Sequence, residues 1–173
     1  MGLLVCAVDI DDGKLAHAKR VGADLVINAK TDDPAATLKK ETGGGAHGVL
    51  ITAPSLGAFK QGVAMTRKLG TCVLVGLPPG EFPVPLFDVV ANCITIRGSF
   101  VGTRQDMAEA LAFATAGKVK ADIELQPLSS INQIFDRLEH GNVASRVVLD
   151  FAKDFERREH DEASNAVLEH ARG

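Results

Sequence analysis

The segment Thr71-Cys72-Val73-Leu74-Val75-Gly76-Leu77-Pro78-Pro79-Gly80 carries the pattern that decides the fold. Its first half is an almost unbroken apolar run, which is typical of a strand buried on both faces of a parallel sheet. The run ends in glycine and a Pro-Pro turn. Ligands of doubly wound sheets bind outside the carboxyl ends of the strands, and a glycine there lets a flat ring approach the backbone. A rigid strand exit without a ligand explains the same residues.

Similar apolar runs lie on both sides of this segment at nearly equal spacing. With the central run included, their starts are 21, 24, 23 and 23 residues apart. This spacing leaves room for one helix and two tight loops per unit. With right-handed crossovers it predicts a doubly wound, Rossmann-like α/β fold built on a parallel sheet. The other runs are Leu3–Asp9, Asp24–Ile27, Gly48–Thr52 and Ile94–Gly98.

Helix start signals lie between the predicted strands. Aspartates at positions 11 and 33 and the serine at position 55 are of the residue types that cap helix N-termini, and Pro34 suits a first helical turn. Glycines close each segment. The predicted helices are Lys14–Val21, Ala35–Glu41 and Leu56–Leu69.

The pattern loosens after Gly98, which divides the chain into three predicted parts. Residues 1–101 form a partial nucleotide-binding domain, residues 102–151 a helix and strand segment, and residues 152–173 a charged helical tail. The second part is predicted to contain the helices Thr103–Ala116 and Ser129–His140 and the strands Asp122–Gln126 and Arg146–Phe151.

Composition excludes several classes of protein. Apolar residues make up 46% of the 173 residues, charged residues 24%, and the net charge is −3. These values argue against bulk disorder and against a nucleic-acid partner. No apolar run approaches the ~18 residues of a membrane helix, and the first residues do not read as a signal peptide. We therefore expect a cytoplasmic protein without a membrane partner.

Polar or small residues end several of the predicted strands. Asp9, at the end of the first run, can accept both hydroxyls of an adenosine ribose, and Lys14 could approach the same sugar. Asp9 could equally cap its own turn, with Lys14 solvated. Thr52-Ala53 and Gly98-Ser99-Phe100-Val101-Gly102 end two further runs. Arg146 enters an apolar strand and needs an anionic partner, which could be a phosphate or a surface carboxylate.

With these residues in place, the sequence resembles the zinc-dependent alcohol dehydrogenases of the medium-chain dehydrogenase/reductase family, especially the bacterial branch. The resemblance runs from Met1 to about Phe151. The matching pieces are Val8-Asp9-Ile10-Asp11, Val21-Gly22-Ala23-Asp24, Val75-Gly76-Leu77-Pro78-Pro79, Arg97-Gly98-Ser99-Phe100-Val101-Gly102 and Gly141-Asn142-Val143-Ala144-Ser145-Arg146-Val147-Val148-Leu149.

The resemblance implies the cofactor NAD and a set of contacts to it. Asp9 and Lys14 would hold the adenosine ribose, and Arg146 would contact the pyrophosphate. Backbone groups around the central glycine turn and the following strand end would face the nicotinamide carboxamide, and Phe82–Leu86 would pair with another subunit across a two-fold axis. The implied cofactor-binding residues are Asp9, Lys14, Thr52, Ala53, Val75, Gly76, Leu77, Ser99, Val101 and Arg146.

Several family features are expected to be missing. The first cofactor strand, its G-x-G-x-x-G turn and the zinc-binding catalytic domain would precede Met1. Gly43-Gly44-Gly45 precedes a strand, not a helix, so it cannot replace the phosphate turn. The three cysteines and five histidines show no zinc-ligand spacing. Removing the central strand of the family's 3-2-1-4-5-6 order would separate the first two strands from the next three.

Two functions remain open from the sequence. The first is the cofactor-domain portion of an NAD-dependent alcohol dehydrogenase, inactive alone and binding NAD weakly or not at all. The second is a non-catalytic nucleotide-binding or assembly module, which forms homo-oligomers or pairs with a full-length dehydrogenase subunit through Phe82–Leu86.

Overall fold

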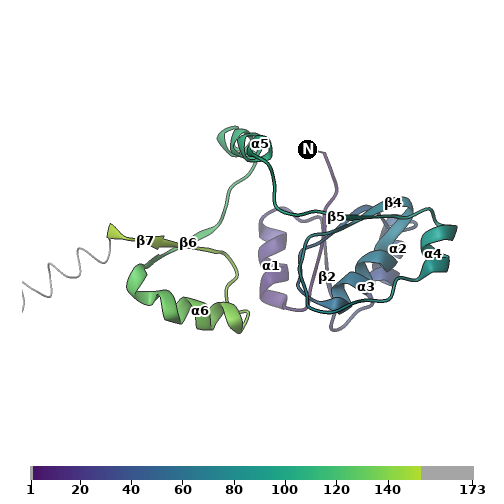
Figure 1. The fold of residues 1–173 in the computed structure, drawn as a ribbon, viewed down its shortest axis with the longest axis horizontal. Coiled ribbons are helices and arrows are strands. Elements are labelled where there is room, and N and C mark those ends of the chain that lie inside the picture. Colours follow the sequence, from purple (N-terminus) through teal and green to yellow (C-terminus); the bar gives the residue numbers. More distant parts are fainter. Residues whose placement is uncertain (1, 153–173) are drawn as a thin grey trace, which may run out of the picture. The chain divides into compact units, whose positions relative to one another are not determined.

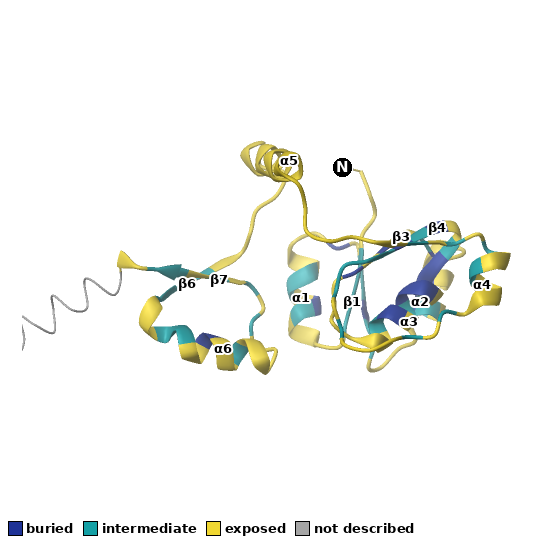
Figure 2. Ribbon diagram, in the orientation of Figure 1, coloured by how far each residue is buried: buried dark blue, intermediate teal, exposed yellow. Residues whose placement is uncertain are grey.

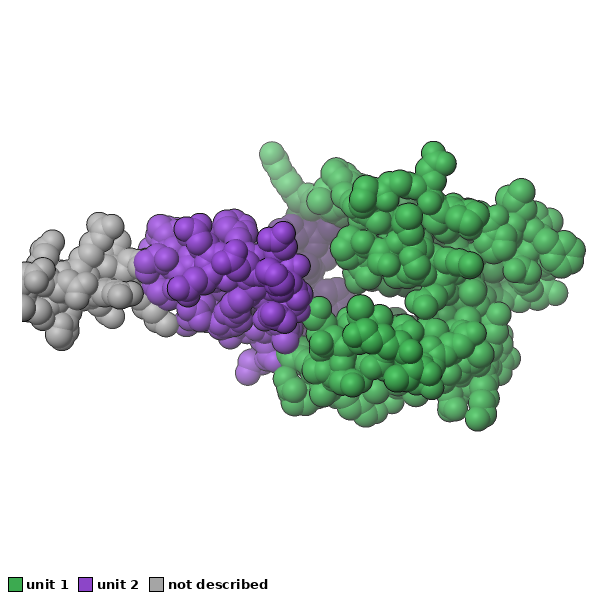
Figure 3. All heavy atoms as spheres, turned by 90° about the horizontal axis from the view of Figure 1, so that it is seen from below, with its two compact units in different colours: residues 1–104 green, residues 105–173 purple. Residues whose placement is uncertain are grey.

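The computed structural model describes residues 2–152. The charged tail predicted for residues 152–173 therefore lies, except for Ala152, outside the described residues. The chain divides into two compact units, with the boundary between Arg104 and Gln105 (Figure 3). Each unit is described by itself below.

Unit 1 alternates strands and helices, as the spacing predicts (Figure 1). Helix α1 lies on one side of the β1–β2 pair, whereas α2 and α3 lie on the other side. The elements are β1 (Cys6–Asp9), α1 (Asp12–Arg20), β2 (Leu25–Asn28), α2 (Pro34–Thr42), β3 (Ala46–Ile51), α3 (Leu56–Met65), β4 (Thr66–Leu74), α4 (Leu86–Ala91) and β5 (Thr95–Gly98).

Short side chains fix the helix ends that the sequence signals. The Asp11 carboxylate accepts a hydrogen bond from the Lys14 amide at 2.9 Å. The Asp33 carboxylate accepts from the amides of Ala35 at 2.9 Å and Ala36 at 3.2 Å, just before the first helical proline. These bonds satisfy amides that have no partner within the helix. Ser55 occupies the N-cap position of α3, but its side chain makes no capping bond.

The strands of unit 1 form two separate parallel sheets, which confirms the predicted incomplete, Rossmann-like α/β fold. One sheet pairs β1 with β2, and the other has the order β3–β4–β5. The separation falls between the first two strands and the next three, as the resemblance implies. The facing edges of β1 and β3 share no ladder, because no strand lies between them in the described chain.

The core of unit 1 lies where α2 and α3 pack on the strands (Figure 2). Val63 and Cys72 are almost fully buried, at 1% and 0% exposed, where α3 covers β4. This packing holds the two sheets together although they share no strand pairing, because residues of both contribute to one cluster. Its buried members are Ile27, Leu38, Val49, Ile51, Phe59, Val63, Met65 and Cys72.

In unit 1, the predicted end of the third helix and the predicted start of the first strand are wrong. Helix α3 ends at Met65, not Leu69, because β4 already begins at Thr66 and pairs there with Ala46 of β3. The first strand begins at Cys6, since only there does its register with β2 start.

The segment Phe82–Leu86, expected from the resemblance to pair with another subunit, pairs with no strand within residues 2–152 of this single chain. It contains no strand in the structure, and Leu86 opens the short helix α4. The prolines at positions 83 and 85 have no N–H to donate to a strand ladder. The Phe82 ring packs edge-on against the Phe59 ring of α3, with the ring centroids 5.4 Å apart.

Unit 2 contains two helices, a 3-10 turn and a pair of parallel strands. Its elements are α5 (Arg104–Thr115), β6 (Ile123–Pro127), the 3-10 turn Leu128–Ser130, α6 (Ile131–Glu139) and β7 (Arg146–Asp150). Arg137 of α6 makes a two-bond ion pair with Glu124 of β6, at 2.7 and 2.8 Å. Within residues 2–152, no helix is both long enough and apolar enough to cross a bilayer.

Candidate functional site

Backbone hydrogen bonds join the carboxyl ends of β3, β4 and β5 at one edge of the sheet. The amides of Val75 and Gly76 both donate to the Ile51 carbonyl, at 3.0 and 2.9 Å. The amide of Ser99 donates to the Leu74 carbonyl at 2.9 Å. These bonds place the two turns predicted from sequence beside each other at the edge where ligands of parallel sheets bind.

Gly76 lies directly against the chain that leaves β3. A β-carbon on Gly76 would lie 2.6 Å from the Ala53 carbonyl oxygen and 3.1 Å from that of Thr52. The space that glycine leaves open is therefore filled by this chain's own backbone. This geometry favours the interpretation of a tightly packed strand exit, and it places Thr52, Ala53 and Gly76 in one cluster.

Two other predicted residues at this edge are strongly exposed. Leu77 is 76% exposed and Val101 is 84% exposed. Val101 also adopts a backbone φ of +43°, a left-handed conformation that β-branched residues rarely occupy. The Ser99–Gly102 turn therefore presents its backbone at the surface in a strained form, of the kind that gathers at binding sites.

Asp9 and Lys14 lie at the end of β1, in the other sheet. One Asp9 carboxylate oxygen accepts hydrogen bonds from the amides of Ile10 at 2.7 Å and Asp11 at 3.0 Å. The carboxylate thus fixes its own turn, as one of the two sequence interpretations states. Within residues 2–152 its second oxygen has no hydrogen-bond partner, so it can still accept from a hydroxyl group.

Asn28, which was not predicted as a site residue, ends β2 beside this turn. The side-chain Nδ2 of Asn28 donates to the Asp12 carboxylate at 2.6 Å, and its side-chain oxygen accepts from the backbone amide of Lys30 at 2.9 Å. The sequence signal for this residue is its place as a polar residue directly after the apolar run Leu25-Val26-Ile27.

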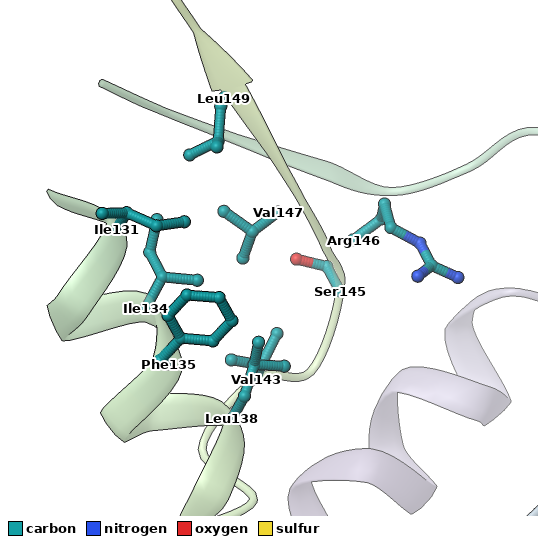
Figure 4. A pocket seen from close by; sticks show the side chains of 9 residues that line it. All are labelled: Ile131, Ile134, Phe135, Leu138, Val143, Ser145, Arg146, Val147 and Leu149. Atoms are coloured by element: carbon teal, nitrogen blue, oxygen red, sulfur yellow. The ribbon is translucent and has the colours of Figure 1, made fainter. Parts of the chain in front are cut away.

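Arg146 belongs to unit 2, where it is exposed at the start of β7. Its amide donates to the Asp122 carbonyl at 3.1 Å. Beside it, side chains of α6, of β7 and of the segment before β7 line a groove of about 230 Å³, and the Arg146 side chain points away from that groove (Figure 4). The groove is lined by Ile131, Ile134, Phe135, Leu138, Val143, Ser145, Arg146, Val147 and Leu149.

The three cysteines are free thiols in three different environments. Cys72 is buried, Cys6 is half-buried and Cys93 is exposed. Burial raises the pKa of the Cys6 and Cys72 thiols, which disfavours the thiolate that binds metals. Among residues 2–152, no three His, Cys, Asp or Glu side chains come together in an arrangement that could hold a metal ion.

The sequence does contain the letters G-x-G-x-x-G, at Gly43-Gly44-Gly45-Ala46-His47-Gly48, which corrects the expectation that the pattern is missing. The structure places it between α2 and β3. Gly43 closes α2 in a left-handed conformation, and Gly48 lies inside β3. A phosphate turn of this type needs a strand before it and a helix N-terminus after it, so this segment does not form one.

Comparison with known proteins gives a family match and curated relatives. A family model described as zinc-binding dehydrogenase matches residues 1–116. An alcohol dehydrogenase of Moraxella sp. (strain TAE123) is 57% identical over 151 residues, which cover 87% of this chain and 44% of that relative. One from Geobacillus stearothermophilus is 53% identical over 149 residues, with 86% and 44% covered. The chain thus spans less than half the length of these relatives.

Solved structures match the fold over a similar range. The alcohol dehydrogenase of the archaeon Aeropyrum pernix aligns with a TM-score of 0.77 and 31% identity, covering 84% of this chain and 42% of that one. A putative alcohol dehydrogenase from Sinorhizobium meliloti 1021 gives a TM-score of 0.79 at 23% identity, with 87% and 44% covered. The second likeness bears on the fold alone.

Proposed function

The chain belongs to the zinc-binding dehydrogenase family, which confirms the resemblance seen in its sequence, and from this premise we propose that it supplies part of the NAD-binding region of an alcohol dehydrogenase. The proposed reaction is hydride transfer between an alcohol carbon and the nicotinamide ring. We expect that reaction to need residues beyond this chain, since the chain spans 44% of its curated relatives.

The observation that carries this proposal is the joined edge at the ends of β3, β4 and β5. The backbone there is fixed by the bonds from Val75, Gly76 and Ser99. Carbonyls and amides held in this way can orient a planar carboxamide without a loss of side-chain entropy. We assign this role to the backbone of Val75, Leu77, Ser99 and Val101, with Thr52 and Ala53 beside them.

The other end of the dinucleotide fits the turn after β1. The second Asp9 oxygen would accept from the ribose hydroxyls, while the first stays bound to the Ile10 and Asp11 amides. Lys14, in the first turn of α1 and half-buried, would lie near the same sugar. Arg146 is assigned to the pyrophosphate on the family resemblance alone. When bound, NAD would supply the hydride acceptor.

A second candidate function is a non-catalytic assembly module. Three large apolar residues of α4 are strongly exposed, namely Leu86 at 73%, Phe87 at 82% and Val90 at 75%. An exposed apolar cluster of this kind is typical of an interaction surface. Under this proposal the segment from Phe82 through α4 would contact a second copy or a full-length dehydrogenase subunit.

A calorimetric titration of NAD into the purified chain tests the first proposal. We expect a weak saturable heat that Asp9→Asn abolishes, because the substitution removes the charge that selects ribose hydroxyls. Glu41→Gln is the matched control, since Glu41 is an exposed acid of unit 1 at the far end of α2. Equal binding by Asp9→Asn and by the parent chain would overturn the ribose assignment. A complete lack of NAD binding would leave the assembly module as the better proposal.

A further inference from the structure

We propose that Asn28 is a positioning residue for the Asp9 carboxylate, which it holds in the orientation that accepts from ribose hydroxyls. This role deepens the proposed function and rests on it, because Asp9 is assigned there to the ribose. Asn28 does not itself contact the nucleotide under this proposal. It acts on the turn after β1 from both ends, through the backbone of Asp9 and through the first residue of α1.

Asn28 lies beside Asp9 in the β1–β2 ladder. The two residues are register partners at the carboxyl ends of their strands. The amide of Ala29, the next residue of the chain, donates to the Asp9 carbonyl at 2.9 Å. The backbone of Asp9 is therefore fixed to the end of β2 at the point where the chain leaves β1.

The side chain of Asn28 holds the other end of the same turn. Its Nδ2 donates to the Asp12 carboxylate at 2.6 Å, and Asp12 is the first residue of α1. Only Ile10 and Asp11 lie between the two anchored positions of the chain. Because both ends of so short a turn are anchored at the end of β2, the turn has little freedom to change its shape.

The Asn28 side chain is half-buried and uses both of its polar groups. Its oxygen accepts from the Lys30 amide at 2.9 Å while its nitrogen donates to Asp12. An aspartate at this position could accept from Lys30, but it has no N–H to donate, and its negative charge would repel the Asp12 carboxylate. The geometry therefore requires the amide of an asparagine.

The shape of this turn decides where the second oxygen of the Asp9 carboxylate lies. The first oxygen is bound to the amides of Ile10 at 2.7 Å and Asp11 at 3.0 Å, and both amides belong to the anchored turn. The carboxylate therefore moves only as the turn moves. A carboxylate that is fixed before binding accepts from neighbouring hydroxyls without an ordering cost, so a loosened turn should lose its selectivity for ribose.

Titrations of the full chain with two nucleotides, followed by nuclear magnetic resonance, test this role. The nucleotides are adenosine monophosphate and its dideoxy analogue, which lacks both ribose hydroxyls. We expect the parent chain to bind the first about tenfold more tightly, which is the order expected for hydrogen bonds to a charged group. Asn28→Asp keeps the acceptor for Lys30 and removes the donor to Asp12, so it should bring the two affinities close to equality.

Two further variants separate positioning from general damage. Thr31→Val is the matched control and should keep the preference, because the Thr31 hydroxyl bonds only to Asn28 and Asp32 of the same exit turn among residues 2–152. Asn28→Asp combined with Asp12→Asn reverses donor and acceptor across one pair, so the preference should return. If Asn28→Asp weakens both nucleotides by the same factor, Asn28 has a structural role only and the positioning role is overturned.

Amide exchange with water distinguishes a failure of this role from a failure of the proposed function. Equal affinity of the parent chain for the two nucleotides, or no binding of either, would refute the ribose assignment of Asp9. Exchange at the Ile10 and Asp11 amides then tests Asn28 without a ligand. We expect Asn28→Asp to speed it by about tenfold and the double variant to restore it, since these amides bond to the Asp9 carboxylate. Unchanged exchange at both amides would overturn the positioning role whether or not a nucleotide binds.

Discussion

Gly76 and Ala53 pack backbone against backbone, so a β-carbon at position 76 would lie 2.6 Å from the Ala53 carbonyl oxygen. This contact joins the ends of β3 and β4 and positions the turn that we assign to the nicotinamide end of NAD.

The first prediction concerns this contact. Gly76→Ala should lower the free energy of unfolding of unit 1 by about 1–3 kcal/mol, because the backbone atoms it meets cannot move as a flexible side chain can. Gly98→Ala is the matched control, since Gly98 ends β5 and has open space around the position of a β-carbon. Urea unfolding of both variants, followed by circular dichroism, measures the difference. Equal stability of the two would contradict the packed exit.

The second prediction separates the two capping residues that the sequence signals. Asp33→Ala should cost about 1 kcal/mol, because its carboxylate accepts two amide bonds at the start of α2. Ser55→Ala should change stability by less than about 0.5 kcal/mol, since its side chain makes no capping bond. Thermal unfolding of the two variants under one buffer decides between them, and a larger loss for Ser55→Ala would refute the assignment.

The third prediction concerns acid sensitivity of unit 2. Hydrogen bonds from Arg137, and then from Gln126, lower the pKa of Glu124 from 4.5 to about 2. A lowered folded-state pKa means that the stabilisation is full above pH 4.5 and is lost as the pH falls toward 2. Protection of β6 and β7 amides from hydrogen exchange should therefore decline across this window. Glu124→Gln should flatten the decline, whereas Glu139→Gln, an exposed acid of α6, should preserve it.

The fourth prediction is the strength of NAD binding. The glycines at 43–48 close a helix and enter a strand, so they do not offer a helix N-terminus to the pyrophosphate. We expect a dissociation constant no tighter than about 1 mM, or roughly −4 kcal/mol. A micromolar constant in the calorimetric titration would show that this chain holds another phosphate site.

The fifth prediction tests the assembly surface. Val84→Lys and Phe87→Lys should each reduce any self-association at tens of micromolar, because they place a charge in or beside the exposed apolar cluster of α4. Val21→Lys is the control, since Val21 is 62% exposed and caps the C-terminus of α1, away from α4 in the chain. Sedimentation velocity measures the oligomer fraction. A fall caused by Val21→Lys alone would move the contact away from α4.

Local sequence signals predicted most elements of unit 1 and failed where packing decided. The Asp33-Pro34 start of α2 follows from side-chain chemistry that acts within three residues, and the structure contains it. The end of α3 could not be predicted in this way, because Arg67, Lys68 and Leu69 are good helix formers that instead lie in β4. The packing of Phe82 on Phe59 could not be predicted either, because Phe59 lies more than twenty residues earlier in the chain.

By itself the sequence determined the parallel α/β class, the family and the division between the first two strands and the next three. The class follows from the period and apolar character of short segments, whereas the family and the division follow from motifs that resemble those of known dehydrogenases and from the strand order that the resemblance implies. Only the tertiary structure decided which strand-end residues meet. It placed Thr52, Ala53 and Gly76 in contact, left Asp9 in the other sheet and fixed one of its oxygens to its own turn. Such contacts depend on register and helix packing between distant segments, and no local pattern encodes these distances.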